Sequence, residues 1–199
     1  GARLYYVLLS SDFFIKNPLL ILMIWTGGIS IHGAFIGGVV FGFFYFKRKK
    51  LPFFPYADFF SVVLPLGQAV GRWGNFFNSE AFGVPVAGNA PFLLFVKESS
   101  RPALLSGHEF FHPVFLYESF FDFLIFLILT YIMKKTANKI DGLIFFSYIL
   151  LYSFIRLILE FFRLDTVCFV FGLPFPALIS LIGIFVGICG IFFRIRQTK

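Results

Sequence analysis

The sequence is poor in charged residues and in cysteine, and each shortage excludes a class of protein. Charged residues make up only 14% of the 199 residues and hydrophobic residues make up 59%, a balance outside the range of soluble globular domains. The two cysteines, Cys168 and Cys189, provide no disulfide framework, and neither has the spacing or histidine neighbours of a metal site. We therefore expect a membrane protein with no structural disulfide, no bound metal and no cofactor.

Features typical of other membrane proteins are also missing. No sequence repeat marks an inverted-repeat transporter, and no Gly-x-Ser-x-Gly segment indicates an intramembrane serine protease. The chain opens with Gly1-Ala2-Arg3-Leu4, which lacks the basic-then-apolar layout of a signal peptide. We expect residues 1–9 to be the last turns of a membrane helix whose start is absent.

The net charge of +7 comes from basic residues that gather between apolar runs. In a soluble protein such a charge would suggest nucleic-acid binding. Short basic patches between apolar runs are instead typical of cytoplasmic loops, so we expect no nucleic-acid partner. The patches are Lys47-Arg48-Lys49-Lys50; Lys134, Lys135 and Lys139; and Arg194, Arg196 and Lys199.

The apolar runs predict an all-α fold, a polytopic membrane helix bundle that forms a single domain over residues 1–199. A bilayer-crossing helix needs about 20 apolar residues. The predicted spans are 1–9 in part, 27–46, 54–71, 114–133, 142–161 and 174–193. With all basic patches in the cytoplasm, loops 10–26, 72–113 and 162–173 face outside. We expect residues 72–113 to form a small extracytoplasmic head.

The most polar segment at membrane depth is Gly71–Gly83, which follows a long apolar run. Its glycines predict a backbone that is not plain helix. Irregular polar backbone at that depth is tolerated only where it lines a cavity or is buried in protein. Arg72 is either an interfacial arginine that reaches lipid headgroups or part of a polar pocket with Asn75, Asn78 and Glu80 that grips a phosphate.

Two further polar groups lie in apolar spans and each has two interpretations. His32 either snorkels beside glycines that allow tight helix packing, or is a neutral imidazole suited to a general base. Tyr152, Arg156 and Glu160 are four residues apart and share a helix face. They form either a structural Arg–Glu pair or a second cation for an anionic substrate.

The remaining intramembrane acids have weaker assignments. Glu118 and Asp122 are a like-charge pair at i, i+4, so we expect Glu118 to pair with an arginine and Asp122 to stay open. Asp58 is a lone acid in a span without an assigned role. Arg163 is interpreted as a contact to lipid headgroups.

Four motifs in order resemble the prolipoprotein diacylglyceryl transferase family. Gly71–Gly83 matches Gly-Arg-x-Gly-Asn-Phe-x-Asn-x-Glu-x-x-Gly at every fixed position, and His32–Gly37 matches His-Gly-(Gly/Ala)-x-Ile-Gly. The other two motifs are His112–Glu118 and Tyr152–Arg163. The resemblance covers nearly the whole chain, although family members carry an additional helix and part of a second before this point, so we expect an N-terminally truncated member.

The resemblance implies a transferase of the bacterial inner membrane. Such an enzyme moves the diacylglyceryl group of phosphatidylglycerol to the lipobox cysteine thiol of a prolipoprotein signal peptide, which forms a thioether and releases glycerol phosphate. The expected partners are phosphatidylglycerol, the prolipoprotein and membrane lipid. The alternative from another class is a fragment of a transporter or channel that uses the buried charged residues as a permeation path.

The resemblance also implies residue roles. His32 is expected to be the general base, and Arg72 and Arg156 are expected to clamp the phosphate, which makes these three the catalytic residues. The expected phosphatidylglycerol-binding residues are Arg72, Asn75, Glu80, Tyr152, Glu160, Gly33 and Gly83.

Overall fold

The computed structural model describes most of the chain as α-helix, and the chain divides into two units. The described residues are 1–80, 82–86, 93–101, 103–136, 140–164, 169–170 and 172–197, and the side chains of 31, 32, 35, 103, 169 and 170 are not described. The units are Gly1–Phe53 and Phe54–Lys199, and each is described by itself. Three residues singled out in the sequence lie outside the described residues, namely Lys139, Cys168 and Lys199.

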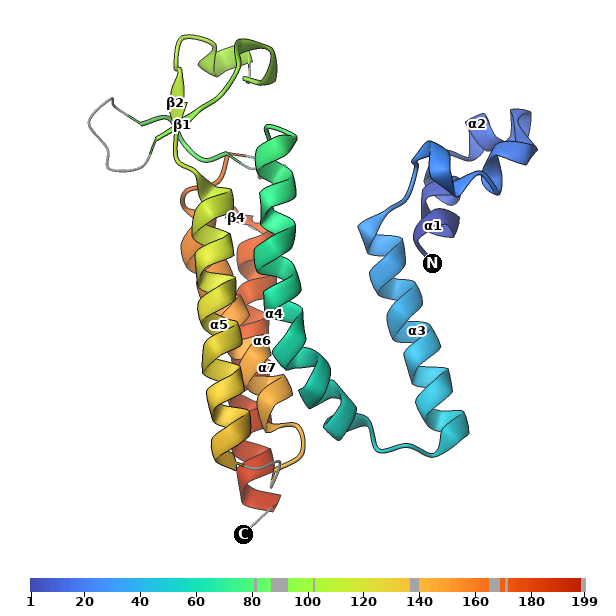
Figure 1. The fold of residues 1–199 in the computed structure, drawn as a ribbon, viewed down its shortest axis with the longest axis vertical. Coiled ribbons are helices and arrows are strands. Elements are labelled where there is room, and N and C mark those ends of the chain that lie inside the picture. The colour runs from blue at the N-terminus through green and yellow to red at the C-terminus, as the bar shows by residue number, and fades with distance from the viewer. Residues whose placement is uncertain are drawn as a thin grey trace. The chain divides into compact units, whose positions relative to one another are not determined.

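The first unit consists of helices joined by short turns (Figure 1). Helix α1 packs against α3, and the short elements lie between them in the sequence. The bounds are α1 Ala2–Leu9, α2 Ser11–Lys16, η1 Pro18–Ile21, η2 Ile24–Thr26 and α3 Ile31–Lys49. Helix α1 therefore falls on the partial span expected at 1–9, and α3 on the span expected at 27–46.

Arg3 holds the segment between α2 and α3 in place. All three guanidinium nitrogens donate hydrogen bonds to backbone carbonyls of that segment, and the guanidinium also lies over the Phe14 ring at 5.1 Å. The accepting carbonyls are those of Leu20, Ile21, Met23, Gly27 and Gly28. The Arg3 side chain thus satisfies carbonyls of the 3-10 turns and loops between α2 and α3.

Glycines decide where α3 begins and how closely it packs. Gly27 and Gly28 have φ of 88° and 71°, a left-handed conformation that favours glycine and stops a helix from starting there. The helix therefore begins at Ile31, four residues after the predicted start of the span. Within α3, a Cβ on Gly33 would lie 2.3 Å from Cβ of Tyr5, so Gly33 is the contact point with α1.

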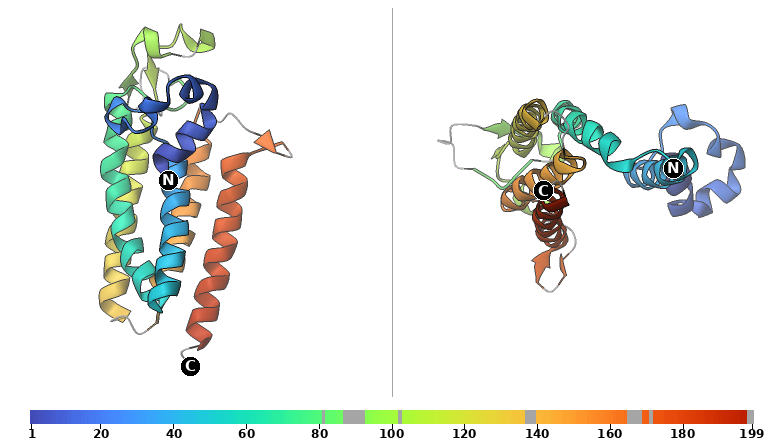
Figure 2. Two further views of the ribbon diagram at one scale, coloured as in Figure 1. Left: turned by 90° about the vertical axis from the view of Figure 1, so that its right-hand side faces the viewer. Right: turned by 90° about the horizontal axis from the view of Figure 1, so that it is seen from below.

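The second unit contains four helices that are long and apolar enough to cross a membrane (Figures 1 and 2). They are α4 Phe53–Phe77, α5 Val114–Thr136, α6 Leu143–Glu160 and α7 Phe175–Gln197. The protein is therefore a multi-pass membrane protein, and the all-α fold class is confirmed. Helix α3 is not among these four, so a span at 27–46 stays a prediction.

Short strands and turns occupy the connections of this unit. Strands β1 Leu94–Phe95 and β2 Phe110–Phe111 pair antiparallel within the segment expected to form a head. A second antiparallel pair, β3 Phe169–Val170 and β4 Leu173–Pro174, precedes α7. Two 3-10 turns, η3 Glu98–Ser100 and η4 Ala103–Leu105, lie between β1 and β2.

Within this unit, helix α6 packs against both α5 and α7. Val62, Ile125, Leu129 and Ile144 form a buried apolar cluster from α4, α5 and α6. The outward positions are large and apolar, as in α7, where Phe185 is 68% exposed. Exposed apolar side chains of this kind are suited to contact with lipid hydrocarbon rather than water.

The two ends of this bundle differ in the elements and in the charged side chains that they carry. The C-terminal ends of α4 and α6 and the N-terminal ends of α5 and α7 lie at the end that carries β1 and β2 (Figure 1). The last turns of α5 and α7, at the other end, are basic, with Lys134, Lys135, Arg194 and Arg196. We call these the head end and the basic end.

Helix α4 corrects one prediction, because it continues through Gly71 and Gly74 to Phe77. A Cβ at either glycine would meet nothing within 4 Å, so no close contact requires glycine at these two helical positions. Beyond the last helical residue, Phe77, the chain is turned away from the helix by Ser79, whose φ of 56° is left-handed. The Glu80 N–H then donates to the Asn75 carbonyl at 2.8 Å and the Ser79 N–H to the Phe76 carbonyl, which is the Schellman arrangement.

Asp58 now has a structural role. It lies near the start of α4 at the basic end, and its side chain is 7% exposed. Its carboxylate accepts hydrogen bonds from the N–H of Gly142 at 2.6 Å and of Phe145 at 2.7 Å. These are orphan donors of the first turn of α6, so Asp58 caps that helix from a residue 84 positions away.

Candidate functional site

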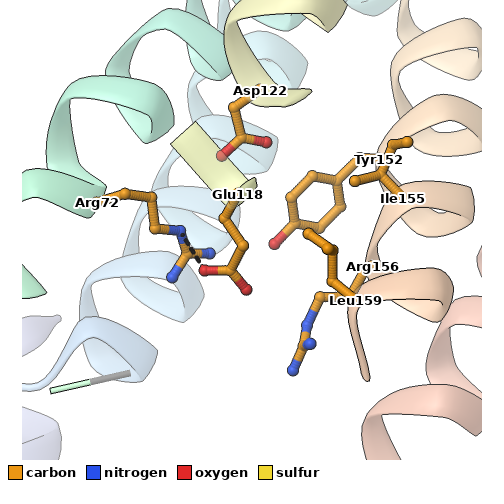
Figure 3. Close-up of a pocket in the computed structure, with 7 residues that line it drawn as sticks. All are labelled: Arg72, Glu118, Asp122, Tyr152, Ile155, Arg156 and Leu159. Atoms are coloured by element: carbon orange, nitrogen blue, oxygen red, sulfur yellow. Dashed lines mark ion pairs between the residues drawn. The ribbon is translucent and has the colours of Figure 1, made fainter. Parts of the chain in front are cut away.

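A small hollow between α4, α5 and α6 brings together two arginines and two acids near the head end of the second unit (Figure 3). Arg72 comes from the last turns of α4, Glu118 and Asp122 from the start of α5, and Tyr152 and Arg156 from the second half of α6. The apolar side chains of Ile155 and Leu159 complete the lining. The two predicted phosphate-binding arginines therefore line one hollow from two different helices.

Glu118 organises the arginines of the site. Its carboxylate is 4% exposed, lies 2.9 Å from Nε of Arg72 and accepts a hydrogen bond of 2.7 Å from Nη1 of Arg163. The expected pairing of Glu118 with an arginine is confirmed. Arg163, interpreted from the sequence as a headgroup contact, pairs with Glu118, and its side chain is 14% exposed. A contact of Arg163 with lipid headgroups stays a prediction.

The turn after α6 is tied to the start of α5 by a short extended segment around Gly83. The Gly83 N–H donates to the His112 carbonyl at 2.8 Å, and the Val84 N–H donates to the Phe162 carbonyl at 2.9 Å. A Cβ on Gly83 would lie 2.4 Å from the Phe162 oxygen, so no larger residue fits. Gly83 thus places Arg163 within reach of Glu118.

His112 and Tyr117 support the same region. The His112 Nδ1 and the Tyr117 hydroxyl lie 3.1 Å apart in a hydrogen bond, and both rings pack edge-on against Phe162. These residues belong to the third sequence motif. Their described contacts are with the loops that hold the site, and they are absent from the lining of the hollow.

On α6 the predicted one-face arrangement of Tyr152, Arg156 and Glu160 holds. Nη1 of Arg156 lies 2.8 Å from Oε2 of Glu160, an i, i+4 pair with Glu160 7% exposed. Tyr152 stacks on Tyr148 with ring centroids 5.7 Å apart, and the Tyr148 hydroxyl contacts the Gln68 amide oxygen at 3.1 Å. These contacts orient Tyr152 and Arg156 along the wall of the hollow.

Asp122 is one helical turn from Glu118 and is 3% exposed. Its Oδ2 atom is fully buried and has no hydrogen-bond partner among the described residues, and no described cation lies within 4 Å of the carboxylate. The expectation that Asp122 stays open is confirmed. Figure 3 shows this carboxyl group and the Tyr152 hydroxyl facing the space between the three helices.

The other predicted substrate-binding residues lie outside this lining. Asn75 and Glu80 contribute backbone groups to the end of α4, and the Glu80 side chain is exposed. Gly33 is buried at the contact of α1 with α3 in the first unit. His32 is the second residue of α3, and its side chain lies outside the described residues. Their roles in substrate binding and catalysis stay predictions.

The guanidinium groups of Arg72 and Arg156 are hydrogen-bond donors in the wall of the hollow. Among the described residues, no three side chains of the His, Cys, Asp and Glu types converge as ligands for a metal ion. The described ion pairs join three arginines to two glutamates, and Asp122 is a third acid of the cluster. A hollow with two guanidinium groups in its wall is suited to bind a phosphate through paired hydrogen bonds.

The set of site residues named from the sequence omitted Glu118 and Asp122. Their signal was present in the sequence as two acids one helical turn apart in an apolar span, where ionisable residues are costly and usually functional. The like-charge spacing predicted different partners for them, but only the fold identified Arg72 and Arg163 as the partners of Glu118.

Comparison with known proteins agrees with the four motifs. Residues 1–193 match the family model described as prolipoprotein diacylglyceryl transferase. Relatives named phosphatidylglycerol–prolipoprotein diacylglyceryl transferase occur in Thermotoga petrophila, with 44% identity over all of this chain and 67% of the relative, and in Trichormus variabilis, with 43% identity over 96% of this chain and 68% of the relative. The relative of that name in Clostridium botulinum is 39% identical over all of this chain and 76% of its own length.

These matches give the transporter or channel alternative no support. They cover both units of the chain, and they include the arginine-containing segments that meet at the hollow. The chain belongs to the prolipoprotein diacylglyceryl transferase family.

Proposed function

We propose that this protein transfers the diacylglyceryl group of phosphatidylglycerol to the lipobox cysteine thiol in the signal peptide of a prolipoprotein. Membership of the family supports the reaction class. The observation that carries the proposal is the meeting of Arg72 and Arg156, from separate helices, in the wall of one hollow at the head end. An anionic lipid headgroup is the ligand that such a site in a membrane protein suits best.

The reaction is an alkyl transfer from a phosphate oxygen to a sulfur atom. The cysteine S–H loses its proton to a base, and the thiolate sulfur attacks the glycerol carbon of the diacylglyceryl group that is bonded to the phosphate oxygen. A C–S bond forms and that C–O bond breaks. The electron pair of the broken bond leaves with the oxygen as glycerol phosphate. The free thiol has an ordinary pKa of about 8.5, so deprotonation is one of the two demands on the enzyme.

The second demand is stabilisation of the departing phosphate, whose negative charge grows as the C–O bond breaks. Arg72 and Arg156 meet this demand as a fixed clamp, because Glu118 and Glu160 already orient their guanidinium groups. Preorganised charges of this kind need no rearrangement during the reaction and commonly make the largest contribution to rate. Tyr152 lies beside Arg156 and supports the headgroup.

His32 is proposed as the base on its sequence motif. A helix N-terminus disfavours the charged imidazolium, and His32 is the second residue of α3. A neutral imidazole is the form that accepts a proton. Asn75, Glu80, Gly33 and Gly83 remain proposed contributors to the phosphatidylglycerol site.

The proposed location is the bacterial inner membrane, with the head end facing outside. The basic last turns of α5 and α7 favour the cytoplasm for the opposite end. The hollow would then lie at the outer leaflet, where both the phospholipid and the signal peptide of an exported precursor are present. Both substrates would reach the site from the membrane.

The test uses membranes that contain the protein, phosphatidylglycerol labelled in its glycerol backbone, and a lipobox peptide. We expect label to appear on the peptide through a thioether. Arg72→Lys keeps the charge but loses the two-pronged donor of the guanidinium, so we expect transfer to fall about 100-fold or more.

The matched control is Arg196→Lys, which makes the same change at the basic end of α7. It should leave transfer within about twofold of the parent protein because surface substitutions rarely matter. Both variants are quantified in the membrane fraction to verify insertion. Full transfer by Arg72→Lys would refute the clamp, and an unlabelled peptide with the parent protein would refute the function.

A further inference from the structure

Asp122 is a buried polar residue that has no role in the proposed transfer reaction. It is 3% exposed, lines the hollow, and leaves Oδ2 without a hydrogen-bond partner among the described residues. Three other buried atoms also lack a hydrogen bond, but each lies in an ion pair of 2.8 or 2.9 Å. An unpartnered carboxyl oxygen in a packed site is costly, and such atoms call for a specific explanation.

The described ion pairs of the neighbouring arginines go to other carboxylates, Arg72 and Arg163 to Glu118 and Arg156 to Glu160. The Tyr152 hydroxyl faces the same space as Asp122. The hollow therefore presents a hydrogen-bond acceptor and a hydroxyl next to two guanidinium groups, and a ligand that carries a hydrogen-bond donor would complete the Asp122 carboxyl group.

The ligand must combine an anion with an uncharged hydrogen-bond donor. The arginines attract a phosphate and repel an ammonium group, whereas the Asp122 carboxylate accepts a hydrogen bond and so needs a hydrogen-bond donor. Asp122 is four residues after Glu118, or about 6 Å along α5, a separation that a three-carbon chain attached to the phosphate can span. A phosphate esterified to a short polyol has this combination, and the headgroup glycerol of phosphatidylglycerol carries two hydroxyls.

From these contacts we infer that Asp122 is a specificity-determining residue that accepts a hydrogen bond from a hydroxyl of the headgroup glycerol. This inference rests on the proposed function and deepens it. The arginines bind the phosphate that all anionic phospholipids share, and Asp122 distinguishes a polyol headgroup from an apolar one. A site that hydrogen-bonds a substrate hydroxyl rejects analogues without it, because its own polar group is then left unpaired.

The test compares three lipids with identical acyl chains, namely phosphatidylglycerol, phosphatidyl-n-propanol and phosphatidylethanolamine. The first two have the same charge and the same phosphate and differ only in the two headgroup hydroxyls. The purified protein is incubated with equimolar mixtures, and the retained lipid is measured by native mass spectrometry. We expect the parent protein to retain phosphatidylglycerol at least about tenfold better than phosphatidyl-n-propanol, the size of one hydrogen bond to a charged group.

Two variants separate selectivity from folding. Asp122→Leu should bring the preference close to one, while Asp122→Asn, which keeps an acceptor oxygen, should retain part of it. Asp58→Asn removes the other buried aspartate of the unit and should leave the preference unchanged. If Asp122→Leu does not fold, the inference is still tested by the lipid preference of the parent protein and by its reduction in Asp122→Asn.

Equal retention of the first two lipids by the parent protein would overturn the inference, as would an intact preference in Asp122→Leu. Stronger retention of phosphatidylethanolamine would also overturn it and would point to a cation as the partner of Asp122. Thioether formation from phosphatidylglycerol is measured in parallel. Transfer without headgroup selectivity would refute the Asp122 assignment and leave the proposed function standing.

Discussion

The two ends of the second unit each bury an aspartate in a membrane helix, but the hydrogen bonding of the two carboxyl groups differs. At the basic end, Asp58 is 7% exposed and accepts two short hydrogen bonds from backbone N–H groups of α6. Near the head end, Asp122 is 3% exposed and leaves a carboxyl oxygen unpartnered in the described structure. The two residues are of the same type and both are buried, so the difference lies in their partners.

That difference separates a structural acid from a candidate functional one. A satisfied buried carboxylate stabilises the fold, because each hydrogen bond offsets the loss of hydration. An unsatisfied one costs stability and calls for a specific explanation. Asp58 is therefore accounted for by the fold, whereas Asp122 is a candidate for a functional role.

The largest expected effect comes from breaking the charge cluster at the head end. Glu118→Gln would remove the buried carboxylate that pairs with the partly buried guanidinium groups of Arg72 and Arg163. We expect a loss of about 3–5 kcal/mol in the free energy of unfolding, together with loss of transfer. Unfolding of the purified protein against denaturant measures it, and a loss below about 1 kcal/mol would contradict the role of Glu118.

A smaller loss is expected from Asp58→Asn at the basic end. The amide can accept one of the two hydrogen bonds, but its NH₂ group then faces the other N–H donor. We expect the free energy of unfolding to fall by about 2 kcal/mol, the value of a hydrogen bond to a charged group. Headgroup selectivity should be unaffected, because α6 is perturbed at its start and the hollow lies along its second half.

The smallest effect on stability is expected from Asp122→Asn, the same substitution at the open end. No hydrogen bond among the described residues is lost, and a buried acid becomes an uncharged amide of similar shape. The free energy of unfolding should stay within about 1 kcal/mol of the parent value or rise. A loss as large as that of Asp58→Asn, measured in the same lipid-free preparation, would show that the two aspartates are alike.

The sequence predicted the parts of the site that depend on local spacing. Arg156 and Glu160 are four residues apart, so their pairing follows from helix geometry once the apolar run is identified as a helix. Glu118 and Asp122 were separated correctly into a paired and an open acid by the same rule. The motif around Arg72 indicated a phosphate site, and both arginines do line one hollow.

From the sequence, Asp58 has no assigned role and the partner of Arg163 is not identified, whereas the irregular backbone predicted at Gly71 and Gly74 is wrong. The cap of α6 by Asp58 joins positions 84 residues apart, and Arg163 reaches Glu118 over 45 residues. No local pattern encodes such pairs. Gly71 and Gly74 suggested an irregular backbone, yet α4 continues through both, because glycine permits left-handed conformations without requiring them.

By itself, the sequence determined the membrane class, the four long apolar helices of the second unit and the family, because hydrophobic length and motif spacing are properties of the chain read in order. Only the tertiary structure decided which acid closes a helix, which acid holds two arginines and which acid remains open. Burial makes every buried acid need a partner, but the identity of that partner depends on which helices pack together.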